Sequence, residues 1–124
     1  LVGSEMCIRD RYAPDQDYGF KNSIFIDFFG NKALTVKFPY IAVRRTNCDV
    51  YLFSLEKKNQ KYFANFKKLN VFGKNLEEDL RTINFEIEEF IRKNPDNYLW
   101  SHRRFKNRPD GEESFYPDNL LRKR

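Results

Sequence analysis

The clearest pattern of apolar and charged positions lies in the second half of the chain and has the period of an α-helix. Five apolar residues recur at intervals of four, three, four and four positions: Leu76, Leu80, Ile83, Ile87 and Ile91. This spacing places them on one face of a helix. Asn75 can cap the first turn, Glu78 follows at the distance of a capping box, and Pro95 stops the helix. The pattern predicts a long helix that packs one face against a core.

Shorter apolar runs earlier in the chain predict strands. Residues 23–30 (SIFIDFFG) are typical of a short, buried strand that ends in a Gly-Asn turn. Residues 49–58 and 61–70 lie on either side of the dipeptide Asn59-Gln60 and predict a β-hairpin. The first run of this hairpin is nearly continuous in apolar residues, as in a central strand. The second alternates with polar residues, as in a half-buried strand.

Residues 33–47 combine helical spacing with a proline. Three residues fall at helical intervals: Val36, Tyr40 and Val43. Pro39 fits a helix only in its first turn, which predicts a helix start near Phe38. Arg44 and Arg45 then lie at the C-terminal end, where cations interact favourably with the helix dipole.

The composition limits the kinds of site that the chain can hold. It has 124 residues, a formal net charge of +5, two cysteines and one histidine. Only Cys48 lies outside the first eleven residues, so we expect neither a disulfide framework nor a closed zinc site, and no cofactor. No apolar run approaches the length of a transmembrane helix. The length fits one small domain or part of a larger one.

Residues 1–11 (LVGSEMCIRDR) have none of the features expected at the start of a protein. They begin with Leu, lack the apolar run of a signal peptide and show no amphipathic period. Their back-translation resembles a transposase adapter used in sequencing libraries. We therefore interpret them as non-native. We expect the genuine sequence to begin at Tyr12 and to continue upstream in the full gene.

The basic charge and the aromatic content, which is 17%, also permit a different function. Lysines and arginines mixed with aromatic residues are typical of nucleic-acid-binding modules. Against this alternative, no known RNA- or DNA-binding motif is present, and the basic residues cluster in one segment. A small interaction domain without catalytic ancestry is a further alternative.

The segment after the long helix carries the most specific motif, NPDNYLWSHRRFKNRPDGEESFYP at residues 94–117. A second motif, APDQDYG at residues 13–19, precedes the strand that ends in the letters FFG. In order and spacing both resemble the lipid A biosynthesis acyltransferases, whose C-terminal signature is approximately P-x-x-Y-x-W-x-H-R-R-F-K-x-R-P-x-G-E. The resemblance covers residues 12–119 and leaves residues 120–124 as a basic tail.

This resemblance implies transfer of a fatty acyl chain from acyl carrier protein to a hydroxyl of a phosphorylated, Kdo-bearing lipid A precursor. In that family a His-x-x-x-x-Asp/Glu motif supplies the general base and the carboxylate that orients it. The motif belongs to the upstream half of such enzymes, so we expect no catalytic residue here and no activity from this fragment alone. His102 does not replace it, because Asn107 stands where the carboxylate would be.

The same resemblance suggests residues that bind the substrate or the carrier protein. The candidates are His102, Arg103, Arg104, Lys106 and Arg108. A phosphorylated acceptor and an acidic carrier both suit arginine, which binds phosphate or carboxylate through two hydrogen bonds. The alternative is a solvated basic face, with Trp100 and Phe105 filling the core and His102 serving only in hydrogen bonding or packing.

Asp15 and Asp17 in the N-terminal motif have two interpretations as well. As part of the family motif they are candidates for lining the active-site cleft. Alternatively, they brace a turn through bonds from backbone N–H groups, as aspartates in loops commonly do. The missing later ligands and closing glutamate exclude a calcium-binding loop of the EF-hand type.

The resemblance also gives the expected fold class and location. The fold class is α/β, the C-terminal part of an αβα glycerolipid-acyltransferase-like domain, with a mixed sheet flanked by helices. We expect the whole enzyme at the cytoplasmic face of the inner membrane of a Gram-negative bacterium, seated on the bilayer partly by basic and aromatic residues. A fragment cut within a sheet exposes an edge and part of a core, which predicts poor solubility.

Overall fold

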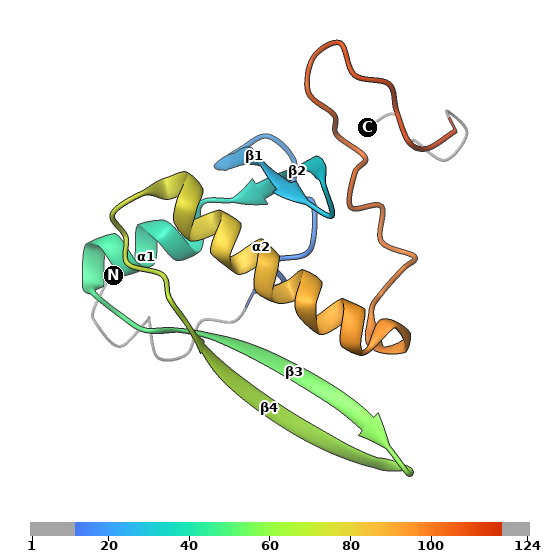
Figure 1. Ribbon diagram of the computed structural model, residues 1–124. Coiled ribbons are helices and arrows are strands. Elements are labelled where there is room, and N and C mark those ends of the chain that lie inside the picture. Colours follow the sequence, from blue (N-terminus) through green and yellow to red (C-terminus); the bar gives the residue numbers. More distant parts are fainter. Residues whose placement is uncertain (1–11, 118–124) are drawn as a thin grey trace.

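The computed structural model describes residues 12–117, so the predicted adapter-derived segment 1–11 and the basic tail 120–124 lie outside the described residues. Two helices and four strands follow one another along the chain, and a 3₁₀ turn, η2, follows the second helix (Figure 1). Their bounds are β1 Ser23–Phe28, β2 Asn31–Val36, α1 Phe38–Thr46, β3 Val50–Lys58, β4 Lys61–Leu69, α2 Leu76–Lys93 and η2 Pro95–Asn97.

Strands β1 and β2 form an antiparallel hairpin in which Phe28 pairs with Asn31. The two turn residues, Phe29 and Gly30, have φ angles of 50° and 75°, as a two-residue hairpin turn requires. The predicted strand is therefore confirmed at residues 23–28, but the predicted Gly-Asn turn is wrong, because the turn is Phe29-Gly30 and Asn31 already pairs with Phe28 in β1. Strand β2 was not predicted, because its Ala33-Leu34-Thr35 run is buried at three successive positions and shows no alternation of buried and exposed residues. The sequence pattern there indicated a segment leading into a helix.

Helix α1 begins at Phe38, as predicted, with Pro39 in its first turn and Arg44 and Arg45 in its last. The helix ends at Thr46, and its C-cap residue, Asn47, adopts the left-handed conformation with a φ of 54°. The Asn47 N–H donates to the carbonyl of Val43 at 2.7 Å and so satisfies one of the terminal carbonyl groups.

Helix α2 is the element that organises the core. Its cap is as predicted: Asn75 Oδ1 accepts from the N–H groups of Glu77 and Glu78, at 3.1 and 3.2 Å. The predicted apolar face is buried from Leu80 to Ile91, with Leu76 only partly covered. The buried core cluster draws on α2, both hairpins and α1: Ile26, Phe28, Ala33, Val43, Leu69, Val71, Leu80, Ile83, Ile87 and Ile91.

Strands β3 and β4 form the predicted hairpin, closed by Asn59 and Gln60, which both have positive φ. The predicted burial of its strands was wrong. Within residues 12–117 β3 is not a central strand, because β4 is the one strand that it pairs with there. β4 is not half-buried, because every residue from Lys61 to Lys68 is exposed. The reason is that no other element among residues 12–117 covers this strand.

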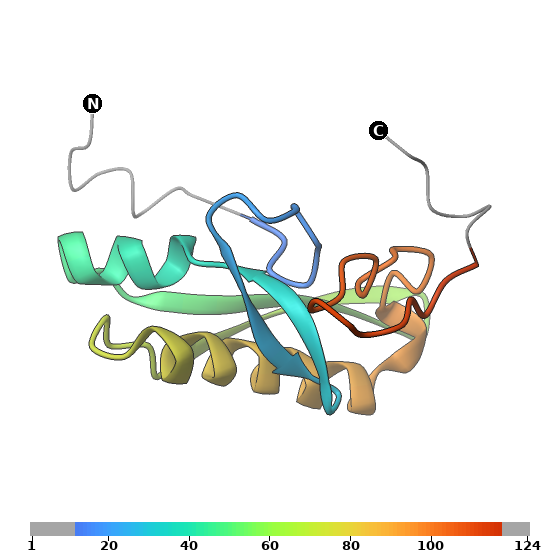
Figure 2. The ribbon, with the colours of Figure 1, turned by 90° about the horizontal axis from the view of Figure 1, so that it is seen from above.

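The α/β class is confirmed, but the predicted mixed sheet does not occur among the described residues. They contain two separate antiparallel pairs, β1–β2 and β3–β4. In Figure 1, α2 runs between the two hairpins, with β1–β2 on one side and β3–β4 on the other. Figure 2 shows the β1–β2 hairpin crossing over α2, with the C-terminal segment beside that hairpin.

Candidate functional site

The two motifs that lie far apart in the sequence meet in the structure. The backbone N–H of Asp17 donates to Nε2 of His102 at 3.0 Å. The side-chain amide of Asn107 donates to both carboxylate oxygens of Asp17, at 2.9 and 3.1 Å. Asp17 is only 4% exposed. The N-terminal loop and the C-terminal signature thus form one polar cluster.

Asp17 also braces its own loop. Its Oδ1 accepts from the N–H of Gly19 at 2.8 Å, and the ammonium of Lys106 lies 3.9 Å from the same oxygen. Turn bracing, one of the two interpretations of this residue, is therefore seen directly. The Asp17 carboxylate fixes the turn through the N–H of Gly19 and also anchors the turn to the signature through the amide of Asn107.

His102 lies in this cluster as a neutral hydrogen-bond acceptor. Its Nε2 accepts a proton donor, so the ring proton is on Nδ1 when the imidazole is neutral. Burial lowers the pKa of His102, and the charges of Lys106 and Arg104 lower it further, while Asp15 and Asp17 raise it. The geometry gives the imidazole a hydrogen-bonding role and places no carboxylate oxygen on it.

Arg104 faces inward and is 2% exposed. Its guanidinium donates to the carbonyl of Leu34 and, at 3.1 Å, to Oγ1 of Thr35, both in β2. The guanidinium carbon also lies 5.1 Å from the centre of the Phe28 ring. Burial lowers the pKa of Arg104. The residue attaches the signature to the first hairpin and presents no accessible surface to a ligand.

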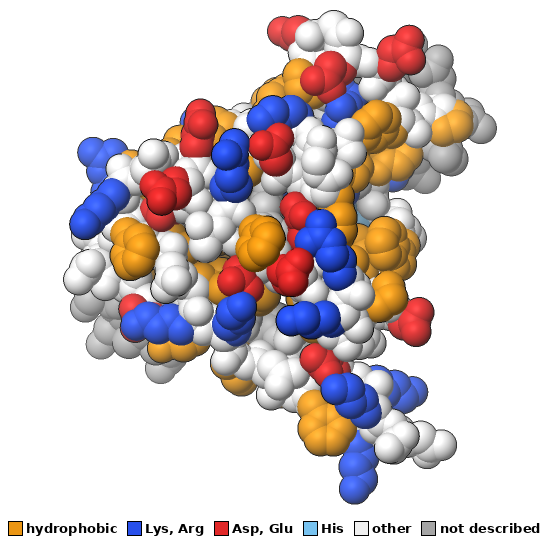
Figure 3. Space-filling view, viewed as in Figure 1, with side chains coloured by type: hydrophobic (Ala, Val, Ile, Leu, Met, Phe, Trp, Pro, Cys, Tyr) orange, Lys and Arg blue, Asp and Glu red, His pale blue; other side chains and the backbone are white. Residues whose placement is uncertain are grey.

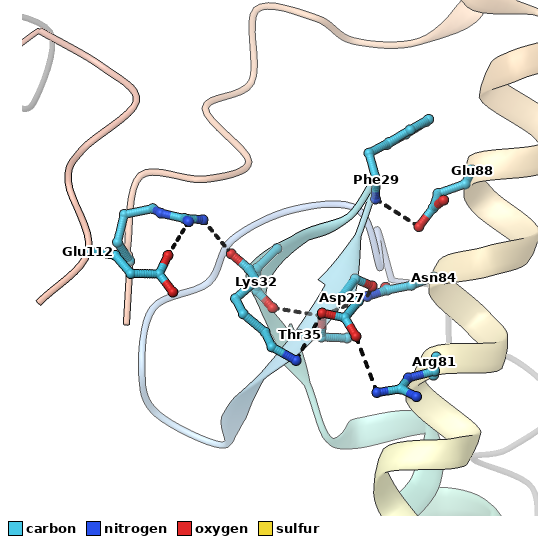
Figure 4. Close-up of polar contacts among 10 residues, drawn as sticks. Asp27, Phe29, Lys32, Thr35, Arg81, Asn84, Glu88 and Glu112 are labelled. Atoms are coloured by element: carbon cyan, nitrogen blue, oxygen red, sulfur yellow. Dashed lines mark hydrogen bonds and ion pairs between the residues drawn. The ribbon is translucent and has the colours of Figure 1, made fainter. Parts of the chain in front are cut away.

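A buried amide completes this attachment from the side of α2. Asn84 donates from Nδ2 to the carbonyl of Asp27 at 3.0 Å and to Oγ1 of Thr35 at 3.2 Å. At the edge of the hairpin the carboxylate of Asp27 binds Lys32 and Arg81 (Figure 4). These bonds lock the β1–β2 hairpin between α2 and the signature.

Arg108 provides a second link to the same hairpin. It donates to the carbonyl of Lys32 at 2.7 Å, pairs with Glu112 and lies 4.1 Å from the centre of the Phe115 ring. Nearby, the N–H of Phe105 donates to the hydroxyl of Tyr116 at 3.3 Å. The irregular signature is therefore held by side chains rather than by a helix or a strand.

The remaining candidates are placed differently. Lys106 has a side chain that is 39% exposed. Arg103 is partly exposed, and within residues 12–117 its guanidinium has no hydrogen bond or ion pair, although its carbonyl accepts from the N–H of Lys106 at 3.2 Å. Asp15 is partly exposed and acts electrostatically on Tyr98 and His102. The structure thus separates inward-facing cations (Arg104 and Arg108) from cations that remain available to a ligand.

Sequence reasoning missed three groups in the cluster. Asn107 was considered only as a missing carboxylate, although its amide is what holds Asp17. Tyr12 and Tyr98 lie close by, and burial is the largest cause that raises the pKa of each phenol, to about 12 for Tyr98. The Tyr98 hydroxyl is buried without a hydrogen-bond partner in the part of the chain that the structure describes. In the sequence, only the position of Tyr98 within the signature indicated that it could belong to the site.

Between Tyr12 and Pro117 no group of three or more His, Cys, Asp or Glu side chains could hold a metal ion. Within the same range, neither α1 nor α2 combines the length and apolar character needed to cross a bilayer.

The chain is similar to bacterial enzymes of lipid A synthesis. The profile of the family described as bacterial lipid A biosynthesis acyltransferase matches residues 10–107. The lipid A biosynthesis palmitoleoyltransferase of Escherichia coli K12 is 35% identical over 109 residues, which are 85% of this chain and 36% of the relative. The lauroyltransferase of the same strain is 32% identical, with the same two coverages. A lipid A biosynthesis acyltransferase of Haemophilus influenzae is 33% identical, over 80% of this chain and 34% of the relative. The chain thus spans about a third of the length of these relatives.

Proposed function

Because the chain belongs to the bacterial lipid A biosynthesis acyltransferase family, we propose that it is part of an enzyme that acylates a lipid A precursor. The donor is an acyl chain on acyl carrier protein, and the acceptor is a hydroxyl of the phosphorylated, Kdo-bearing precursor. The observation that supports this most directly is the bonding of Asp17 to His102 and Asn107. It explains why two motifs at opposite ends of the matched region occur together.

In this proposal residues 12–119 are the C-terminal part of an αβα acyltransferase domain. The general base belongs to a His-x-x-x-x-Asp/Glu motif that this chain does not contain. His102 does not take its place, because its Nε2 already accepts the N–H of Asp17. Acyl transfer then requires the rest of such an enzyme, and the 124-residue chain alone is inactive.

The cluster has a positioning role in this scheme. Asp17 holds the loop in which Asp15 is partly exposed, so both residues contribute to one wall of the cleft. Arg104 and Arg108 keep the signature in place through the carbonyls of Leu34 and Lys32. Ligand contact is left to the outward-facing cations.

We assign contact with phosphate or with the acidic carrier protein to Arg103 and Lys106. An accessible guanidinium can bind a phosphate through two parallel hydrogen bonds, and an ammonium adds a mobile charge beside it. No observation favours the nucleic-acid-binding alternative. Two of the four signature cations bind backbone carbonyl groups of the chain itself.

The proposed site of action is the cytoplasmic face of the inner membrane, where the carrier protein and the lipid precursor meet. The signature carries large apolar side chains that are at least half exposed, among them Leu99, Trp100 and Phe115. Trp100 does not fill the core, as one interpretation of the sequence held, because it is 64% exposed. Aromatic side chains beside cations suit the surface of an anionic bilayer.

A chimaera tests this function. Residues 12–119 replace the matching third of the E. coli palmitoleoyltransferase, and mass spectrometry follows acyl transfer from acyl carrier protein to the lipid A precursor. We expect product from the chimaera and none from the 124-residue chain.

The double substitution Arg103→Ala and Lys106→Ala in the chimaera should raise the KM for the acceptor or the carrier protein about tenfold or more. A chimaera with native-like circular dichroism that forms no product would contradict the proposed activity. An unchanged KM would remove these two residues from the binding site.

A further inference from the structure

The outward face of the β3–β4 hairpin carries a row of uncovered apolar side chains. We call it the aromatic face and define it by Tyr51, Phe53, Leu55, Tyr62 and Phe66, which are 43–70% exposed. Phe53 and Phe66 pair across the strands, and their ring centres lie 5.1 Å apart. Figure 3 looks onto the side of the molecule that carries α2, where Lys and Arg side chains lie beside apolar ones at the projecting end of the hairpin, and the aromatic face is turned away from this view.

The opposite face of the hairpin is packed against the rest of the chain. Val50 and Leu52 pack on the core cluster, and Glu56 accepts from the amide of Asn94 at 3.4 Å. Lys67 forms an ion pair with Glu86 of α2. This packing covers the β3 side of the hairpin, whereas β4 is exposed from Lys61 to Lys68 and the aromatic face is open.

The two long edges of this hairpin are open as well. β3 and β4 pair only with each other among the described strands, so each presents one edge with unpaired N–H and C=O groups. A two-stranded sheet is marginal in water, and an open edge tends to recruit another strand. An αβα domain has helices on both faces of a wider sheet. Among residues 12–117, the β3–β4 hairpin has no third strand at either edge and no helix over its aromatic face.

A bilayer surface and a polypeptide both fit an apolar face, and the open edges distinguish between them. A bilayer surface covers aromatic side chains but adds no strand to pair with an open edge. A polypeptide with strands and an apolar helix satisfies both the edges and the face. The curated relatives are nearly three times as long as the region matched here, so they contain additional polypeptide of the same enzyme class.

We propose that the aromatic face and the open edges of β3–β4 are a docking surface for another part of a lipid A acyltransferase polypeptide. That part adds strand pairing at an edge and an apolar layer over Phe53 and Phe66. Lys57, which pairs with Tyr62 on the aromatic face, is exposed, so the docked part carries an acidic residue opposite it. The inference rests on the proposed function, because it takes the family's fold to be completed by this contact.

The test uses the full 124-residue chain and the part of the E. coli palmitoleoyltransferase that this chain does not match. The two are co-expressed, and binding is measured by co-purification and by titration of the purified partners. We expect a complex. The double substitution Phe53→Ser and Phe66→Ser should weaken it about tenfold or more. The matched control is Phe85→Ser, which removes a similarly exposed phenylalanine from α2 and should leave binding unchanged.

Any of the next three outcomes overturns the inference. Equal binding by both variants removes the aromatic face from the contact. A concentration-dependent dimer of the chain that the double substitution abolishes, without binding to the E. coli part, makes a second copy the occupant. Binding only to phosphatidylglycerol vesicles makes it a lipid surface. Complex formation without acyl transfer would count against the proposed function alone. An active chimaera unaffected by the double substitution would count against this surface alone.

Discussion

The backbone N–H of Asp17 donates to Nε2 of His102 at 3.0 Å, across 85 positions of sequence. This single bond joins the N-terminal loop to the signature and requires an unprotonated Nε2. Protonation of the ring would place two donors against each other at a site where Asp17 is only 4% exposed. The bond therefore makes the stability of the fold sensitive to pH.

We expect the chain to lose stability as the pH falls below about 6.5. The pKa of His102 is lowered from 6.5, chiefly by burial, so the unfolded chain binds this proton more tightly than the folded one. The stabilisation from neutral His102 is then fully present above pH 6.5 and is lost as the pH falls through the folded pKa. Urea unfolding followed by circular dichroism from pH 8 to pH 5 measures the effect.

His102→Ala is the control for this pH dependence. It should flatten the change between pH 7 and 5 and lower stability at pH 8 by about 1–3 kcal/mol, because the Asp17 N–H loses its acceptor. A later fall below about pH 4 should remain in both proteins. The hydrogen bond to Lys32 lowers the pKa of Asp27, and its contribution is lost only in that range. A variant as steep as the wild type between pH 7 and 5 would show that another group titrates.

Asn107→Ala should destabilise the chain by about 1.5–3 kcal/mol. The amide supplies two bonds to the buried carboxylate of Asp17, and bonds to charged groups are the stronger kind. Asn107→Asp should be at least as costly, because it places a second carboxylate beside the first. A double-mutant cycle with Asp17→Ala measures the coupling, and additive effects would mean that the two side chains do not interact.

Arg104→Lys should not preserve stability, although the charge is kept. An ammonium cannot bind the Leu34 carbonyl and Thr35 Oγ1 in the fixed geometry of a guanidinium, nor stack on Phe28 in the same way. A stranded buried acceptor costs about 1–3 kcal/mol. Arg103→Lys is the neighbouring control and should change stability by no more than about 0.5 kcal/mol. Equal urea midpoints for the two variants would argue against the attachment role of Arg104.

Gly73→Ala should be strongly destabilising, because a Cβ there would lie 2.7 Å from the backbone nitrogen of Arg44 in α1. The clash adds about 1–3 kcal/mol to the cost of a left-handed conformation, since Gly73 has a φ of +68°. Gly111→Ala is the matched comparison, with a φ of +85° but no atom within 4 Å of the added Cβ. Thermal unfolding of both variants separates the clash from the conformational strain, and equal losses would exclude the clash.

Local signals in the sequence were sufficient for several elements. The apolar spacing and the Asn75 cap determine helix α2, and Pro39 locates the start of α1. The Asn59-Gln60 turn marks the second hairpin. These features depend on neighbours a few positions apart, so their physics is contained within short segments.

Strand burial is different, because it depends on what lies above and below a sheet. The buried Ala33–Thr35 run of β2 has neighbours on both faces and shows no alternation. For β4 the alternating apolar residues predicted a half-buried strand, but the strand is exposed, because residues 12–117 provide no layer that covers it.

The sequence by itself determined the family motifs, the two helices and the charge of the signature. Only the tertiary structure decided what those charges do. Arg104 and Arg108 turn inward to backbone carbonyls of β2, while Arg103 and Lys106 do not. The sequence does not show which of two adjacent arginines is buried, because burial depends on a hairpin some 70 positions away. The bond between Asp17 and His102 has the same origin, since long-range contacts arise from packing rather than from local propensity.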